Sequence, residues 1–112
     1  NKTLQVAKGF GDQLFAVETD ILISKDGIPF LLHDTTFRRT TNIREVFGDP
    51  FIDPTSMNFS QIEKLDAGSW FVEQNPFGTI GTEWISEKEA ESYRGAKVPT
   101  LRSLLEVLAL HK

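Results

Sequence analysis

The spacing of hydrophobic residues changes near Phe15. Before it, apolar residues at positions 4, 7 and 10 follow a helical repeat and predict a short first helix capped by Thr3, which Gly9 and Gly11 weaken. From residue 15 to residue 23 the chain is mostly β-branched or apolar, which predicts a strand. The pattern therefore places a helix before the first strand.

The dipeptide Asp26-Gly27 separates this strand from a second apolar run over residues 28–33. Asp-Gly between two apolar runs favours a hairpin with a two-residue turn. With Asp26-Gly27 as the whole turn, Lys25 pairs with Ile28, and counting outward along both strands places Asp20 directly across from His33. Directly opposed side chains share one face of the sheet, with Cβ atoms roughly 5 Å apart. We therefore expect Asp20 and His33 to be cross-strand neighbours.

Two helices are predicted further along the chain. Asn58 and Gln61 have the spacing of a capping box, and Gly68 is placed to end the helix that follows. Residues 78–97 are polar and acidic, as is typical of a surface excursion. Thr100 begins a last helix with leucines at positions 101, 104, 105 and 108 on one face. The order helix, paired strands, helix, helix predicts part of an α/β protein.

Composition narrows the classes of function. Twelve basic and 16 acidic residues give a net charge of −4, which argues against nonspecific binding to nucleic acid. The absence of cysteine excludes disulfides, thiolate zinc sites and a cysteine nucleophile. The 112 residues suffice for one domain at most. Because the chain begins within a pattern and ends within a helix-like segment, we expect a fragment.

Two carboxylates mark the first strand as a candidate site. Glu18 and Asp20 are two residues apart and share one face of the strand. Carboxylates on an otherwise apolar strand are costly to bury unless positive charge compensates them. A divalent cation would do so, and oxygen ligands favour magnesium, calcium or manganese over zinc. The alternative is that both residues form the solvated edge of a half-exposed strand.

The histidines and arginines leave several interpretations open. His33 has the chemistry of a metal ligand or of a general acid/base, or else of a structural hydrogen-bonding group. His111 lies near the end of the last helix and is expected to interact with the helix dipole. Arg38, Arg39 and Arg44 form a basic stretch that would meet an anionic group such as phosphate, or would simply be solvated.

Several spaced segments resemble the glycerophosphodiester phosphodiesterase family. These segments are Glu18-Thr19-Asp20-Ile21, Ser24-Lys25-Asp26-Gly27-Ile28-Pro29, His33-Asp34, Arg39-Thr40-Thr41-Asn42, Leu65-Asp66-Ala67-Gly68-Ser69-Trp70-Phe71 and Val98-Pro99-Thr100-Leu101. The resemblance covers most of the chain, apart from the acidic stretch before Lys97. Several blocks in the same order are far more specific than any one of them.

The resemblance implies an α/β fold, a TIM (β/α)8 barrel with its active site at the carboxyl ends of the strands. A whole barrel needs roughly 250 residues. Residues 1–112 would then be an incomplete N-terminal part of the catalytic domain, with only the early strands and helices. In the family a His-Arg pair precedes this region and a further metal-binding glutamate follows it.

The same resemblance implies roles for three residues. Glu18 and Asp20 match the metal ligands, for Mg²⁺ or Ca²⁺, and His33 matches a catalytic histidine. The implied reaction cleaves a glycerophosphodiester to glycerol 3-phosphate and an alcohol, with a lysophospholipid as the other substrate class. No nucleic acid partner is expected. The alternatives are a noncatalytic interaction module on the same scaffold and a structural metal-binding domain.

Within the family, the segment from Glu45 to Asn58 and the phrase over residues 30–36 resemble the multi-pass membrane branch from animals. That branch implies a membrane protein whose catalytic domain is extracellular or lumenal. Two glycosylation sequons, at Asn1 and Asn58, are compatible with this location and with a glycoprotein.

Overall fold

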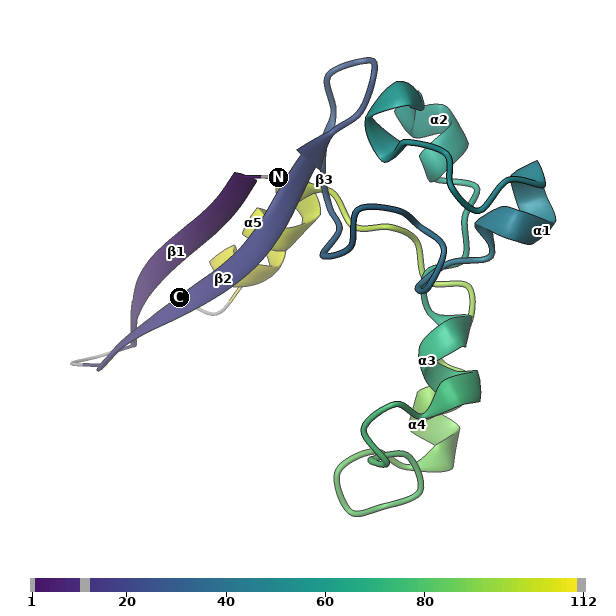
Figure 1. Cartoon of the computed structure of the whole chain (residues 1–112). Helices are drawn as coiled ribbons and strands as arrows, with labels where there is room; N and C mark the ends of the chain where they lie inside the picture. Colours follow the sequence, from purple (N-terminus) through teal and green to yellow (C-terminus); the bar gives the residue numbers. More distant parts are fainter. Residues whose placement is uncertain (1, 11–12, 111–112) are drawn as a thin grey trace.

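The computed structural model describes residues 2–10 and 13–110. Its sheet has three antiparallel strands in the order β1 (Lys2–Phe10), β2 (Gln13–Ile23) and β3 (Pro29–Leu31). β1 and β2 form a long curved ribbon along one side of the molecule (Figure 1). The predicted hairpin is therefore present between β2 and β3, and a second hairpin precedes it.

Helices follow the sheet along the chain. They are α1 (Ile43–Phe47), the 3-10 helix η1 (Pro54–Ser56), α2 (Phe59–Ile62), α3 (Ser69–Gln74), α4 (Glu87–Glu91) and α5 (Leu101–Ala109). In Figure 1, α3 and α4 extend away from the sheet as an arm, whereas α5 lies beside the sheet. The radius of gyration is 15.5 Å, compared with about 13 Å for a compact domain of 100 residues. The arrangement is therefore open.

The predicted first helix is wrong, because residues 2–10 form strand β1. Every position of β1 is paired with β2, from Lys2 opposite Ile21 to Phe10 opposite Gln13. Gly9 lowers helix propensity in this segment, and the long partner strand offers a hydrogen-bonded alternative. Sheet pairing thus overrides a marginal helical repeat.

The predicted register of the β2–β3 hairpin is also wrong by one residue. Ile21 pairs with Leu31 and Ile23 with Pro29, which leaves five residues, 24–28, between the strands. Within this segment the N–H of Ser24 donates to the carbonyl oxygen of Ile28 at 3.0 Å, so the turn itself consists of residues 25–27, one more than the predicted Asp26-Gly27 pair. Gly27 closes this turn in a left-handed conformation with φ 88°. The backbone N–H of Leu32 donates to the carbonyl oxygen of Asp20 at 3.2 Å. Leu32 therefore takes the place across from Asp20 that was predicted for His33.

The hydrophobic core lies between β3 and the α1–α2 region. Its buried residues are Phe30, Leu32, Phe37, Ile43, Met57, Ile62, Leu65 and Val98. Phe30 and Phe37 stack with their ring centroids 5.8 Å apart. The backbone N–H of Leu31 donates to the carbonyl oxygen of Pro99 at 2.9 Å. This contact brings the segment before α5 against β3.

The local helix signals have mixed outcomes. Gln61 Oε1 accepts a hydrogen bond from the backbone N–H of Asn58 at 3.0 Å, so the capping box is confirmed. The Thr100 cap is confirmed as well, because its side chain accepts from the N–H of Ser103 at 3.0 Å. Gly68 does not end α2, which stops at Ile62, and instead precedes α3. The acidic excursion is mostly exposed and contains α4.

Candidate functional site

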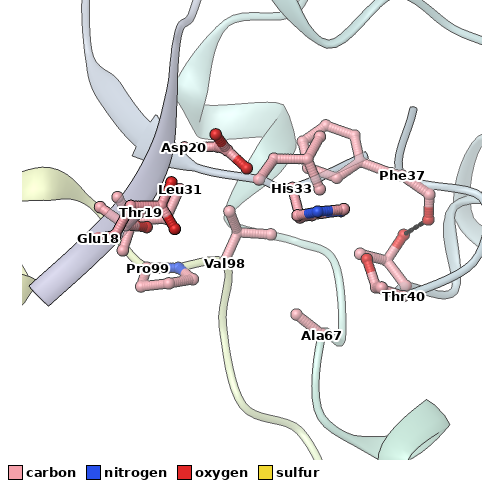
Figure 2. Close-up of a pocket in the computed structure, with 12 residues that line it drawn as sticks. Glu18, Thr19, Asp20, Leu31, His33, Phe37, Thr40, Ala67, Val98 and Pro99 are labelled. Carbon is pink, nitrogen blue, oxygen red and sulfur yellow. Dashed lines mark hydrogen bonds between the residues drawn. The ribbon is translucent and has the colours of Figure 1, made fainter. Parts of the chain in front are cut away.

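A hollow of about 370 Å³ lies beside β2 and the end of β3. Glu18, Asp20 and His33 all line it, together with apolar side chains that include Phe37 and Val98. Figure 2 shows the two carboxylates on one side, carried by β2, and the His33 ring across from them. The structure therefore brings the three predicted site residues together.

The reason for this grouping differs from the one predicted. β3 ends at Leu31, so His33 lies beyond the region where strand alternation decides which way a side chain points. The one-residue shift in register would have turned His33 to the opposite face of a continuing strand. Because the chain leaves the sheet after Leu32, the His33 side chain still borders the hollow.

Glu18 and Asp20 have the chemistry of two ligands for a hard divalent cation. Both line the hollow from the same strand, Glu18 exposed and Asp20 half-buried. Carboxylate oxygens are the donors that Mg²⁺ and Ca²⁺ prefer. Within residues 2–10 and 13–110, no group of three or more potential ligands is arranged around a common point. The pair thus fits part of a coordination shell, and other ligands would be water, substrate or further residues.

His33 is held by its neighbour in the chain. Its side chain is 84% exposed, and its Nδ1 lies 3.0 Å from Oδ1 of Asp34. The hydrogen bond with Asp34 raises the pKa of His33, and the negative charges of Asp20 and Asp34 raise it further. His33 is therefore protonated over a wider pH range than an ordinary histidine, which suits a group that gives up a proton.

Asp34 is itself paired with Arg39. The guanidinium donates from Nε to Oδ2 at 2.8 Å and from its Nη2 to Oδ1 at 2.9 Å, a two-pronged contact. The hydrogen bonds from Arg39 lower the pKa of Asp34 to about 2, against the opposing effect of burial. Arg39 also lies over the ring of Trp70, with its guanidinium carbon 5.2 Å from the centroid.

This pairing changes the interpretation of the basic stretch. The anionic group that Arg39 binds is the carboxylate of Asp34, which belongs to the chain itself. The guanidinium carbon of Arg38 lies 5.5 Å from the centroid of the Phe51 ring. Neither the contact of Asp34 with Arg39 nor that of Arg39 with Trp70 was predicted from the sequence. Arg39 follows Asp34 by five residues, a spacing that by itself does not reveal a contact, and no local pattern links either residue to Trp70.

Some predictions concern residues outside the described part of the chain. The expected dipole interaction of His111 and the sequon at Asn1 both lie there. Among the helices of residues 2–10 and 13–110, none combines the length and apolar character needed to cross a bilayer.

Comparison with solved structures defines the class of fold. The chain is similar to glycerophosphodiester phosphodiesterase from Agrobacterium tumefaciens str. C58, with a TM-score of 0.53 and 31% sequence identity. The match covers 80% of this chain and 28% of that one. The α/β fold is thus that of part of a TIM barrel, as the sequence predicted.

Residues 4–112 match the glycerophosphoryl diester phosphodiesterase family, and the chain belongs to that family. The resemblance drawn from the spaced segments is confirmed.

Curated relatives include glycerophosphodiester phosphodiesterase domain-containing protein 5 from Homo sapiens, 41% identical over 94% of this chain and 17% of that protein. Human glycerophosphoinositol inositolphosphodiesterase GDPD2 is 43% identical over 82% of this chain and 17% of its own length. Glycerophosphodiester phosphodiesterase from Bacillus subtilis (strain 168) is 36% identical over 85% of this chain and 27% of its own length. The chain thus spans less than a third of each of these relatives.

Proposed function

We propose that the complete protein carrying this chain is a metal-dependent phosphodiester hydrolase that cleaves glycerophosphodiesters to glycerol 3-phosphate and an alcohol. The observation that carries the proposal is the meeting of Glu18, Asp20 and His33 at one hollow, in a chain that belongs to the glycerophosphoryl diester phosphodiesterase family. Glycerophosphodiesters and lysophospholipids are the proposed substrate classes, and relatives named for hydrolysis of such diesters support the first.

Glu18 and Asp20 are the proposed metal ligands of this chain, for Mg²⁺ or Ca²⁺. Their support is chemical, since they are two oxygen donors on one strand at the edge of the hollow. A cation held there would polarise the phosphoryl oxygens and offset the negative charge of the substrate. The two side chains would also position the phosphate beside His33.

His33 is the proposed acid/base group of this chain. Since the carboxylate of Asp34 is ionised at neutral pH, it accepts a hydrogen bond, and Nδ1 of His33 carries the proton in that contact. The proton to be transferred would then reside on Nε2. The raised pKa of His33 favours its work as the acid that protonates the oxygen of the departing alcohol. A second histidine, outside this chain, would activate the attacking hydroxyl.

The test is hydrolysis by the purified complete protein. We expect release of glycerol 3-phosphate from glycerophosphocholine or glycerophosphoinositol, its loss after treatment with a chelator, and its return with Mg²⁺ or Ca²⁺. The alternative is a noncatalytic metal-binding or interaction module. A metal-dependent rise in melting temperature without hydrolysis of either diester or of a lysophospholipid would establish that alternative and overturn the proposal.

We further propose that the protein is a membrane glycoprotein with this domain on the extracellular or lumenal side. Resemblance to the animal multi-pass branch supports the location, and Asn58, an exposed residue in a sequon, supports glycosylation. Ser60→Ala removes this sequon while leaving the Asn58 cap of α2 in place. When the complete protein is expressed in animal cells, the Ser60→Ala variant should migrate faster on a gel than wild type. Treatment of both with glycosidase should remove this difference. A protein unaffected by glycosidase and cleaved by external protease only after permeabilisation would contradict the proposal.

A further inference from the structure

Four side chains form a continuous series of contacts that ends at the hollow. Trp70 donates from Nε1 to the carbonyl oxygen of Ala67 at 3.0 Å, and its ring carries the Arg39 guanidinium at 5.2 Å. Arg39 in turn binds Asp34 through two hydrogen bonds of 2.8 and 2.9 Å. The Oδ1 atom of Asp34 lies 3.0 Å from Nδ1 of His33. We call Trp70, Arg39 and Asp34 the His33 support.

We propose that the His33 support positions the His33 ring. Asp34, which is held in place by Arg39 and Trp70, keeps His33 in one tautomer and one ring orientation. Nε2 is then the nitrogen that faces the substrate. This inference rests on the proposed function, because it assigns residues that act through the proposed acid/base histidine.

Exposure of His33 is the reason that such a support matters. With 84% of its side chain exposed, the ring has little packing to restrict its rotation. Its hydrogen bond with Asp34 is a polar contact that restricts this rotation, and the negative charge of Asp20 also acts on the ring. A hydrogen bond to an ionised carboxylate is stronger than one between neutral groups and selects the nitrogen that carries the proton.

The geometry of Arg39 distinguishes the support from an ordinary surface ion pair. Exposed ion pairs contribute little when both side chains remain free to move. Here the planar guanidinium uses two donors on one carboxylate and stacks on an indole whose own N–H is bonded. The Ala67 backbone that receives the indole is tied by its N–H to the carbonyl oxygen of Ala96 at 2.7 Å. Each member therefore restricts the next.

Kinetics of the complete protein test the inference through His33 itself. Arg39→Ala should lower kcat roughly 10- to 100-fold, by analogy with the loss of a hydrogen-bond partner that orients a metal-ligating histidine, with little change in KM. Arg39→Lys should restore part of kcat, since lysine keeps the charge but not the two-pronged contact. In a His33→Ala background, Arg39→Ala should have no further effect on kcat. Arg102→Ala, at an exposed arginine of α5, is the matched control and should leave kcat unchanged.

Histidine ¹⁵N chemical shifts give a readout that does not require activity. The His33 signal, assigned by its loss in His33→Ala, should report the proton on Nδ1 in the wild type and a mixture of tautomers in Asp34→Ala and Arg39→Ala. Absence of hydrolysis by the wild type would refute the proposed function. The tautomer of His33, measured by its ¹⁵N shifts, would still show whether the His33 support positions the ring. Equal losses of kcat from Arg39→Ala in both backgrounds, or an unchanged tautomer in Asp34→Ala, would overturn the inference.

Discussion

The carboxylate of Asp26 accepts a hydrogen bond from the backbone N–H of Phe59 at 2.9 Å, across a separation of 33 residues. Asp26 thereby joins the β2–β3 turn to the first turn of α2. The Ser24 hydroxyl donates to the same carboxylate at 2.6 Å, and the N–H of Lys25 donates to the carbonyl oxygen of Met57 at 2.8 Å. The β2–β3 turn, which lies between Asp20 and His33 in the chain, is thus attached to a distant segment.

Replacing Asp26 with alanine should destabilise the protein, because the N–H of Phe59 loses its acceptor. Hydrogen bonds from Ser24 and Phe59 lower the pKa of Asp26, so its contribution is present above the ordinary carboxyl pKa and is lost as pH falls through the lowered value. Melting temperatures of the complete protein and of its Asp26→Ala variant should therefore differ at pH 7 and converge in strong acid. Asp49→Ala, which removes only a local bond to Phe51, should have the smaller effect.

Asp66 should make a larger pH-dependent contribution. Burial acts to raise its pKa, but the Ser69 hydroxyl and the N–H groups of Ser69, Gly68 and Gly95 lower it to about 2. This contribution is complete above the ordinary carboxyl pKa and is lost as pH falls through about 2. In denaturant unfolding of the complete protein between pH 7 and pH 2, the free energy of unfolding should depend less on pH for Asp66→Asn than for wild type. Equal slopes for the two proteins would contradict the assignment.

Gly68→Ala should be among the most damaging small substitutions. A Cβ atom at this position would lie 1.8 Å from the carbonyl oxygen of Tyr93, and backbone must move to admit it. We expect a loss of stability of about 1–3 kcal/mol, the usual cost of overpacking, measured by denaturant unfolding. Gly78→Ala provides the comparison, because its Cβ would meet open space. The cost there comes from the φ of 64°, a left-handed conformation that alanine adopts less readily than glycine. A smaller loss for Gly68→Ala than for Gly78→Ala would be evidence against this close approach.

Substitutions at the three site residues should separate their roles. His33→Ala should lower turnover of the complete protein roughly 10²- to 10⁴-fold, as expected for a lost acid/base group, with little loss of metal affinity. Glu18→Ala and Asp20→Ala should instead weaken metal binding, so that excess metal restores part of the activity. Calorimetric metal titration and steady-state kinetics check both expectations. Loss of metal binding in His33→Ala, with binding intact in Asp20→Ala, would show that the roles are reversed.

The isolated chain of 112 residues should have no useful phosphodiesterase activity and should aggregate. Apolar side chains of the α5 region are exposed, including Val107 at 52% and Leu110 at 83%. Exposed apolar patches and unpaired strand edges promote association. Light scattering and hydrolysis of glycerophosphocholine by the purified chain provide the measurements. A soluble monomer that melts cooperatively and hydrolyses this diester would disprove the expectation.

The amino-acid sequence by itself determined the features that depend on residues close together in the chain. The Asn58–Gln61 capping box and the Thr100 cap each join groups three residues apart, so their spacing alone predicts the contact. The strand β2 and the presence of a hairpin at Asp26-Gly27 follow equally from local pattern. The spaced segments were sufficient to predict the family and the partial barrel.

Tertiary structure decided what depends on distant partners. Pairing with β2 makes residues 2–10 a strand. The β2–β3 hairpin, whose turn is bonded through Asp26 to the distant Phe59, has a register that differs by one residue from the predicted one. His33 borders the hollow because the chain leaves the sheet after Leu32, which strand alternation does not reveal. Local propensities differ by a few tenths of a kcal/mol, whereas long-range pairing adds many hydrogen bonds and buried contacts at once. Tertiary contacts therefore prevail wherever the local preference is weak.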